Sequence, residues 1–487
     1  MNERERTAHL LRRFGLGAGY CELARYPQGS KATLNALLND DKTADPNGVN
    51  PWQFLAQPDG KLDTGSYHLG PWWALRMVMT RSPFMEKLTL FWHDHFALDG
   101  EKVGEAPTMY AYLDVLRTHG RGKFRDLLKA VMTQGAMLMY LDGHTSQKTH
   151  PNENLARETF ELFTMGEGAG YTETDIKELA RALTGWSMHY MGSFLDEPYD
   201  RTKKRADEAH MALNNFCYVP ALHDDGVKTI LGKSARFTGE QALDLLADHP
   251  KTAQYICGKL WSFFATPEPA PAAVAKMVAV WKQTDGDIRA VLKSIADQPE
   301  FWADHCVRQM PKSPVDWCVS MFRSMDLAAP LVAKHKTPSK DATPVEKELL
   351  EIGNTVYYMM SQQGLQLLYP PNVAGWNWGP GWIAADTSIK RFRSGDGFFW
   401  AGGESRPYAI QTAAKIKSAF KVTDSATLVD AYLELFDGKT TPEQRTALVA
   451  TCDKLGSVKA LENKDQSANL FTMMSRLLFA IPDFQLC

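Results

Sequence analysis

The feature that most constrains the fold of this 487-residue chain is a recurring helix-start signal followed by apolar residues at helical spacing. Ser82 is a candidate N-cap, and Pro83 suits the first helical position of one such segment. Further along, Thr172 and Asp175 stand at capping-box spacing before an apolar stripe that ends at Gly185. The sequence therefore predicts a mainly α fold, a multi-helix globular array with long irregular loops and little strand.

The same signals divide the chain into segments. We predict helices over residues 82–92, 109–118, 122–141, 152–165, 172–185, 240–247, 250–265, 270–283, 286–297, 314–326 and 344–363, and again within 407–487. Residues 227–231 are a short strand candidate, and the stretches that lack periodicity are 186–220, 328–345 and 364–405. We expect a main helical domain over 1–405, which carries the functional cleft, and a C-terminal helical segment over 406–487 packed on it.

Composition and charge exclude several classes of protein. The formal net charge of −3 gives no overall attraction to nucleic acid, and no apolar run is long enough to span a membrane. Seven scattered cysteines without C-x-x-C spacing indicate neither a disulfide framework nor a Cys-based zinc site. The N-terminal residues contain no apolar signal segment, so we expect a cytoplasmic location as the sequence stands, or a periplasmic or exported one if a signal was removed.

The sequence FWHDHF contains two histidines, His93 and His95, that are candidate metal ligands. On a helix the two side chains would point about 200° apart and could not share a metal ion. They could share one only if the helix ended near Trp92 and the chain became extended, because residues i and i+2 of an extended chain face the same side. Asp224 is a further candidate ligand, and imidazoles suit zinc, iron, copper or nickel. The alternative is two histidines that pack a helix end among aromatic residues.

A second candidate is the polar face of the predicted helix over 152–165. Asn154, Arg157, Glu158 and Glu161 fall within an arc of about 100° on a helical wheel. Two carboxylates at this spacing can ligate a metal or act as general acid and base. Asn152 and Asn154, at the start of the helix, can hydrogen-bond backbone or ligand. The alternative is a solvated face on which Arg157 pairs with Glu161.

Two further segments supply candidate residues. His223 is followed by Asp224, which offers either an acid/base histidine or an Asx-type turn leading into the short strand. Trp376, Trp378 and Trp382 stand among glycines in the sequence GWNWGPGW and cannot form a regular element. Tryptophan rings on such a loop either stack on sugars and other planar ligands or plug the helical core.

Many of these segments match the motifs of a known family. The matching segments are HLLRRFGLGA (9–18), FMEKLTLFWHDHFA (84–97), AMLMYLDGHTSQKTHPNENLARETFELFTMG (136–166), YTETDIKELARALTGW (171–186), HDDGVKTILGK (223–233), KSPVDW (312–317), LYPPNVAGWNWGPGWI (368–383) and FAIPDFQL (479–486). With them the chain resembles the bacterial domain of unknown function 1800 family from end to end. The resemblance implies no assigned activity. It also implies that many relatives are exported and encoded beside sulfatase-like proteins, which makes such a protein a candidate partner.

We infer a polar cleft formed by these segments, and three functions are compatible with it. The first is a hydrolase or group transferase that acts on a polar, glycan-like substrate, with or without a divalent metal ion. In this hypothesis the catalytic residues are Glu158, Glu161, Arg157 and His223, the substrate-binding residues are Asn152, Asn154, Asn372, Trp376 and Trp378, and the metal ligands are His93, His95 and Asp224. The alternatives are an iron- or copper-dependent oxidoreductase, and a non-catalytic binding or maturation partner of an exported sulfatase-like protein.

Overall fold

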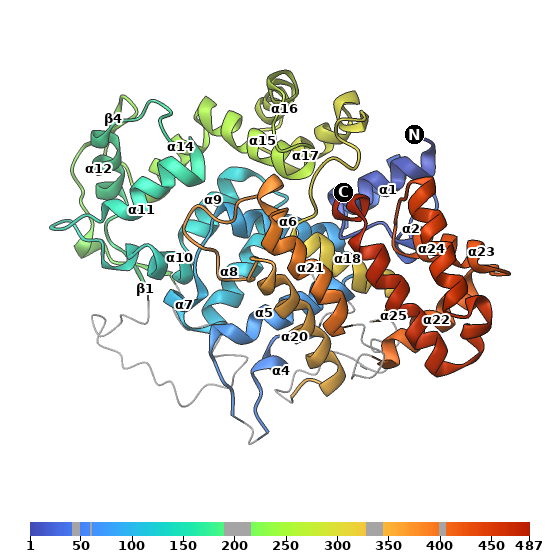
Figure 1. Ribbon diagram of the computed structural model, residues 1–487. Coiled ribbons are helices and arrows are strands. Elements are labelled where there is room, and N and C mark those ends of the chain that lie inside the picture. Colours follow the sequence, from blue (N-terminus) through green and yellow to red (C-terminus); the bar gives the residue numbers. More distant parts are fainter. Residues whose placement is uncertain (41–48, 59–60, 189–215, 328–343, 399–405) are drawn as a thin grey trace.

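A computed structural model describes residues 1–40, 49–58, 61–188, 216–327, 344–398 and 406–487, and it confirms the predicted mainly α fold (Figure 1). Two small antiparallel sheets lie within this described part. Strand β1 (Trp186–Met188) pairs with β2 (Phe216–Tyr218), and β3 (Lys228–Ile230) pairs with β4 (Lys233–Ala235). No helix of the described residues is both long enough and apolar enough to cross a bilayer.

The helices of the first half are α1 (Glu3–Phe14), α2 (Tyr20–Ala24), α3 (Ser30–Leu38), α4 (Trp52–Leu55), α5 (Leu69–Met79), α6 (Pro83–His95), α7 (Gly100–Val103), α8 (Ala106–His119), α9 (Phe124–Met132), α10 (Gly135–Tyr140), α11 (Glu153–Glu158) and α12 (Glu173–Ala182). The helices of the second half are α14 (Gly239–Ala247), α15 (Pro250–Phe264), α16 (Pro271–Gln283), α17 (Ile288–Ala296), α18 (Pro314–Met325), α20 (Lys347–Gln362), α21 (Ala385–Phe398), α22 (Arg406–Ala419), α23 (Ser425–Leu435), α24 (Pro442–Lys454) and α25 (Lys464–Ala480). Short 3-10 turns are η1 (Ser66–His68), η2 (Gly143–Thr145), η5 (Pro220–Leu222), η6 (Pro299–Trp302), η7 (Gly379–Trp382), η8 (Ser457–Glu462) and η9 (Pro482–Gln485), whereas η3 (Thr159–Thr164) is a π-helical turn.

The structure corrects three predictions of local structure. The stretch 364–405 is not irregular throughout, because α21 occupies its second half. The segment 122–141 is two helices, α9 and α10, since the Thr133 hydroxyl bonds the carbonyl of Lys129 and the chain becomes extended at Gln134. The stretch 186–220 begins and ends in the paired strands β1 and β2. Its middle, 189–215, lies outside the described residues, as does most of the stretch 328–345 that was predicted to lack periodicity.

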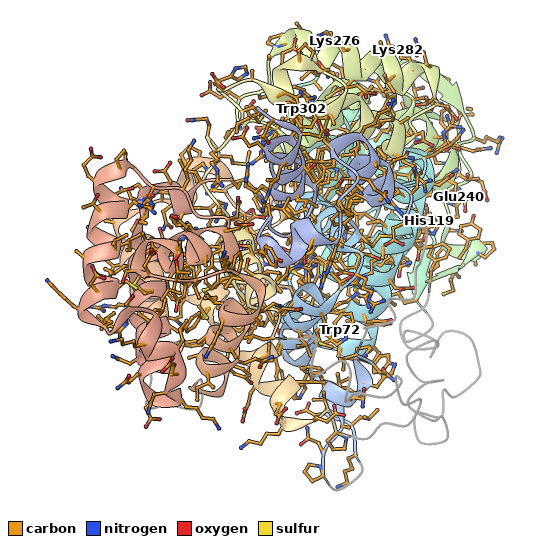
Figure 2. The ribbon with its side chains drawn as sticks, turned by 90° about the vertical axis from the view of Figure 1, so that its right-hand side faces the viewer. Trp72, His119, Glu240, Lys276, Lys282 and Trp302 are labelled. Carbon is orange, nitrogen blue, oxygen red and sulfur yellow. The ribbon has the colours of Figure 1, made fainter. Side chains whose placement is uncertain are left out.

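Helix α6 runs through the middle of the molecule, and all of its residues are buried. It contacts α1, α3 and α8, while α5 packs against α18 and α20 (Figure 1). Large side chains such as Trp72 of α5 fill the space between these helices (Figure 2). Because α6 has no solvent-exposed face, each of its charged residues needs a partner inside the protein.

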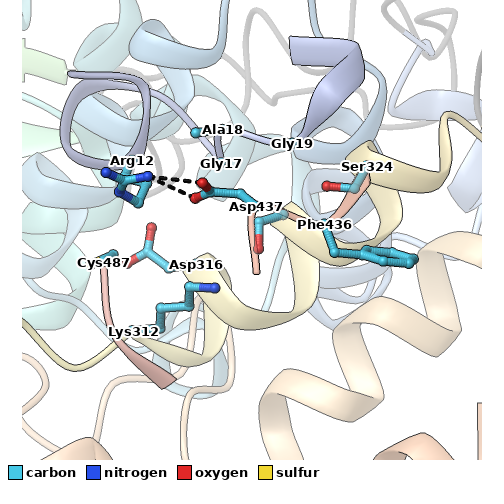
Figure 3. A pocket seen from close by; sticks show the side chains of 11 residues that line it. Arg12, Gly17, Ala18, Gly19, Lys312, Asp316, Ser324, Phe436, Asp437 and Cys487 are labelled. Carbon is cyan, nitrogen blue, oxygen red and sulfur yellow. Dashed lines mark hydrogen bonds and ion pairs between the residues drawn. The ribbon is translucent and has the colours of Figure 1, made fainter. Parts of the chain in front are cut away.

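Motifs from both ends of the chain meet at a small pocket of about 10 Å³, about the size of one water molecule (Figure 3). Arg12 of α1 donates two hydrogen bonds, each 2.9 Å long, to the carboxylate of Asp437, which follows α23. Lys312 is buried beside this pair, and burial lowers its pKa to about 8. The segment 406–487 therefore packs against the N-terminal helix, and its status as a separate domain stays a prediction.

Among the buried charged residues of α6, Glu86 is the one whose charge is most strongly compensated by its neighbours. Arg117 donates to both carboxylate oxygens, at 3.1, 3.3 and 3.0 Å. Arg76 donates at 2.6 Å and the Trp73 indole at 2.8 Å. Burial by itself would raise the pKa of Glu86, but the two guanidinium groups outweigh it and hold this pKa at about 2.

We expect Glu86→Gln to lower the free energy of unfolding by about 3–5 kcal/mol at pH 7, because it leaves two buried guanidinium groups without their carboxylate. Urea denaturation followed by circular dichroism measures the loss. The wild-type contribution should be complete above pH 4.5 and should be lost as the pH falls towards 2, because the pKa is depressed in the folded state.

The matched control is Asp430→Asn, which removes an exposed ion pair of 2.7 Å with Arg445 and should cost at most about 1 kcal/mol. A loss for Glu86→Gln no larger than that of the control would contradict a central structural role for Glu86.

Candidate functional site

The two candidate metal-binding histidines lie at the C-terminal end of α6. The helix continues through His95 instead of ending near Trp92, so His93 and His95 point in different directions. The His93 ring is buried among the rings of Trp73, Tyr112 and Trp376, at centroid distances of 5.5, 5.8 and 5.6 Å. Burial lowers the pKa of His93 to about 3, so the ring is neutral.

His95 packs on the opposite side of the helix. Its Nε2 lies 3.1 Å from the carbonyl oxygen of Phe163, in the π-helical turn. Burial, assisted by the positive charge of Lys259, lowers the pKa of His95 well below its usual value. Both histidines therefore fit the alternative interpretation, in which neutral rings pack a helix end among aromatic side chains.

Asp94, between the two histidines, holds the tryptophan-rich loop in place. Its Oδ1 accepts a 2.7 Å hydrogen bond from the backbone N–H of Trp376. The preceding residue, Gly375, has φ +84°, and a Cβ there would lie 2.3 Å from Oδ1 of Asp94. Only glycine allows this close approach of the loop to the carboxyl group.

The carboxyl group of Asp94 is unusual because its burial is only partly compensated. Burial raises its pKa, whereas the charge of Lys259, the Trp378 side chain and the Trp376 backbone N–H lower it, and the result is a pKa of about 6. Glu86, on the same helix, has two arginine partners and a pKa of about 2. Near neutral pH, Asp94 can therefore both accept and release a proton.

Asp94 borders a pocket of about 380 Å³, within the size range of small-ligand sites. The lining residues are Phe91, Asp94, Gln254, Tyr255, Gly258, Lys259, Ser262, Phe263 and Trp378. Phe263 and Trp378 form one aromatic wall, with ring centroids 4.7 Å apart. On another side, the ammonium group of Lys259 lies 5.7 Å from the centroid of Tyr255. The pocket thus combines a carboxyl group, an amine and flat apolar surfaces.

Helix α15 supplies the second charged group of this pocket. Tyr255, Lys259 and Ser262 occupy positions i, i+4 and i+7, so they share one face of the helix. Burial lowers the pKa of Lys259, and Asp94 opposes that effect. No carboxylate within the described residues forms an ion pair with Lys259. Sequence analysis missed this residue, although its helical spacing with Tyr255 and Ser262 could have indicated it.

The predicted catalytic carboxylates lie elsewhere, on the polar face of α11 and the π-helical turn. Arg157 forms two hydrogen bonds of 2.8 and 2.7 Å with Glu173, and a longer contact of 3.5 Å with Glu161. Burial and the charge of Glu161 raise the pKa of half-buried Glu158. Neither Glu158 nor Glu161 lines the Asp94 pocket.

The two asparagines at the start of this helix have different environments. The Asn152 side chain accepts the backbone N–H of Asn154 at 2.8 Å and donates to the carbonyl of Asp142 at 2.8 Å. Asn152 is therefore the N-cap of α11, which gives it a structural role whatever else it binds. Asn154 is exposed and is not part of the pocket lining.

His223 and Asp224 form a separate cluster beside α12. The buried His223 ring places Nδ1 2.8 Å from the carbonyl of Thr184. Asp224 binds Arg181 at 2.8 Å and also accepts the backbone N–H of Gly226, which is the predicted Asx-type turn. The hydrogen bond from Arg181 lowers the pKa of Asp224 to about 2, although burial opposes it.

The tryptophan-rich loop fits the core-sealing interpretation for two of its three tryptophans, and ligand stacking by the third stays a prediction. Trp376 and Trp382 are buried and seal the core, whereas half-buried Trp378 faces the pocket. Asn372 is exposed, and its side chain accepts the Ala374 N–H at 2.8 Å within a turn that leads to Gly375.

The structure therefore brings together only part of the predicted cleft. His93 contacts Trp376, but His95 and Asp224 lie in other environments, so these three residues do not form a common metal site. Within the described residues, no three His, Cys, Asp or Glu side chains are grouped so that they could hold a metal ion. The segments that do meet are the end of α6 and the tryptophan-rich loop, together with α15.

Comparison with known proteins identifies a family but no activity. A family model described as "Protein of unknown function (DUF1800)" matches residues 9–486, essentially the whole chain. No curated protein and no solved structure matches the chain. The chemistry of the pocket has to be inferred from its own residues.

We expect Asp94→Asn to stabilise the protein above pH 7 by about 2–3 kcal/mol, since a rise in pKa from 3.8 to about 6 corresponds to roughly that cost of ionisation. Asparagine carries no charge and keeps an oxygen for the Trp376 N–H. The stability that the wild-type carboxyl gains from protonation is complete below pH 3.8 and is lost as the pH rises through 6. Urea denaturation at pH 4 and pH 8 should show the gain only at pH 8.

Asp224→Asn is the matched control, and we expect it to change the free energy of unfolding in the opposite direction. The pKa of Asp224 is lowered in the folded state, so its replacement should destabilise the protein at pH 8. If Asp94→Asn instead destabilises the protein at pH 8, the ionised carboxylate is a structural requirement and our interpretation of the pocket is wrong.

Proposed function

We propose a function from the pocket itself, because the chain belongs to the DUF1800 family, which is described only as being of unknown function. The proposed function is that of an enzyme, a hydrolase or group transferase that acts on a polar, ring-containing substrate such as a glycan. The site of reaction is the pocket between Asp94 of α6, Lys259 of α15 and Trp378 of the loop.

The observation that carries this proposal is the pKa of about 6 for Asp94 inside a pocket large enough for a ligand. A buried carboxyl group with so little compensation makes the folded state less stable near neutral pH, and such groups are concentrated at functional sites. A group whose pKa lies near the operating pH is also the most effective proton-transfer catalyst. We assign the acid/base role to Asp94 rather than to Glu158 or Glu161, since neither of those lines the pocket.

The other pocket residues have roles that follow from their chemistry. In hydrolysis, the Asp94 carboxylate takes a proton from water as the water oxygen forms its bond, and the resulting carboxylic acid returns that proton to the leaving oxygen as its bond breaks. Lys259 stabilises negative charge that develops on the substrate. The aromatic wall of Phe263 and Trp378 offers a flat surface on which a sugar ring can stack.

We expect turnover of at least one member of a panel of 4-nitrophenyl glycosides, esters and phosphates, with a kcat/KM profile that changes near pH 6. Asp94→Asn should lower kcat by about 10²–10⁴-fold, the usual contribution of a positioned acid/base group. Trp378→Ala should mainly raise KM, because stacking contributes to binding. Release of 4-nitrophenol measures each effect.

Glu158→Gln is the matched control, because it removes a carboxylate that the sequence predicted to be catalytic and leaves the pocket intact. Loss of activity in Glu158→Gln but not in Asp94→Asn would contradict our assignment. Binding of a sugar with no turnover of any panel member would favour the non-catalytic hypothesis. Turnover that needs added iron or copper and an electron acceptor would favour the oxidoreductase.

A further inference from the structure

A second, larger groove lies away from the Asp94 pocket, between the N-terminal helices and the end of α17. Its volume is about 940 Å³. The lining residues are Arg6, Gln28, Ser30, Lys31, Ala32, Leu34, Asn35, Leu38, Lys293, Ala296, Asp297, Pro299 and Trp302. Trp302 lies where α1 and α3 approach the α16 and α17 region (Figure 2).

Two helices form the walls of this groove. Lys31, Leu34 and Leu38 follow one stripe of α3 at positions i, i+3 and i+7. Ala296 lies one turn after Lys293 on the facing helix, α17, which contacts α3. Grooves between two helices, with an apolar floor, are the usual receptors of a third, amphipathic helix.

Positive charge predominates on the rim. Arg6, Lys31 and Lys293 line the groove, against a single lining carboxylate, Asp297. Asp297 is already paired with Lys293 at 2.5 Å. Within the described residues, Lys31 forms no ion pair. The groove therefore has a local excess of positive charge, which favours an acidic ligand, although the net charge of the chain is −3.

Arg6 and Trp302 form a preorganised binding surface at one end of the groove. The Arg6 guanidinium lies 4.2 Å from the centroid of the Trp302 ring. The Trp302 indole donates to the carbonyl of Ala296 at 2.8 Å, and the ring packs on Phe301 at a centroid distance of 4.9 Å. Arginine and tryptophan held in this way are typical anchors of protein interfaces. Nearby Glu3, whose carboxylate accepts both the N–H and the hydroxyl of Ser30, stays ionised and partly offsets the charge of Arg6, so Lys31 is the main source of excess positive charge.

We propose that the groove between α3 and α17 binds an acidic amphipathic helix of a partner protein. Apolar side chains of that helix would lie on Leu34, Leu38 and Ala296, and its carboxylates would lie against Lys31 and Arg6. The charge of the rim selects an acidic segment over a neutral or basic one. The proposal is independent of the chemistry at Asp94, because the two sites share no lining residue.

Fluorescence anisotropy of labelled synthetic peptides tests this proposal with the full chain. One peptide of about four helical turns carries leucine along one face and glutamate on the flanks, and its partner peptide has lysine in place of each glutamate. We expect the glutamate peptide to bind and the lysine peptide to bind at least about tenfold more weakly, with an affinity for the glutamate peptide that falls as salt rises.

Lys31→Glu should weaken binding of the glutamate peptide by about tenfold or more. Lys282→Glu, the same charge reversal at an exposed site on α16 outside the groove, should leave it unchanged (Figure 2). Absence of binding, equal binding of the two peptides, or equal effects of the two variants would overturn the proposal. Self-association of the chain that Lys31→Glu abolishes would also overturn it, since the occupant would then be a second copy.

Discussion

The structure depends most on the burial of α6 together with its charged residues. This helix has no exposed face, yet it carries Glu86, Lys87 and Asp94. Glu86 binds two arginines from α5 and α8, and Lys87 forms an ion pair with Asp316 of α18. Each ion pair fixes a neighbouring helix to α6 at a defined rotation, because a buried charge that lost its partner would cost several kcal/mol. The charges of one central helix therefore link it to α5, α8 and α18.

The two acids of α6 show how the same residue chemistry serves different purposes. Glu86 has two guanidinium partners and stays ionised, which makes it a structural connection. Asp94, two turns further on, has no guanidinium partner; the charge of Lys259, the Trp378 side chain and the Trp376 backbone N–H compensate its burial in part, and its ionisation stays unfavourable. The difference lies in the number of compensating groups rather than in burial, since both side chains are inside the protein. Asp94 is thus the acid of this helix that remains available for chemistry.

Sequence patterns were sufficient for the fold class and for most of the helices, because capping residues and apolar stripes act locally. The helix that begins with the capping box at Thr172 is an example, and the short strand near Lys228 was also predicted. The site was harder to predict, because it depends on which residues the fold brings together. The HDH sequence drew attention to His93 and His95, but continuation of α6 directs both rings into the core and leaves the residue between them at the pocket. Lys259 was not predicted: its spacing with Tyr255 and Ser262 indicates a shared helix face, but the local sequence does not show that this face borders a pocket.

The contacts of α1 have a consequence for synthesis of the chain. His9 bonds the carbonyl of Phe301, Arg13 bonds those of Phe264 and Ala265, and Arg12 bonds Asp437. At about 5–20 residues per second, the ribosome needs on the order of tens of seconds to reach these partners after it has made α1. During that interval His9, Arg12 and Arg13 lack these distant partners, although α1 can already contact α2 and α3. The charged groups of α1 therefore wait for residues made late in synthesis, so the first helix can reach its final packing only when the chain is nearly complete.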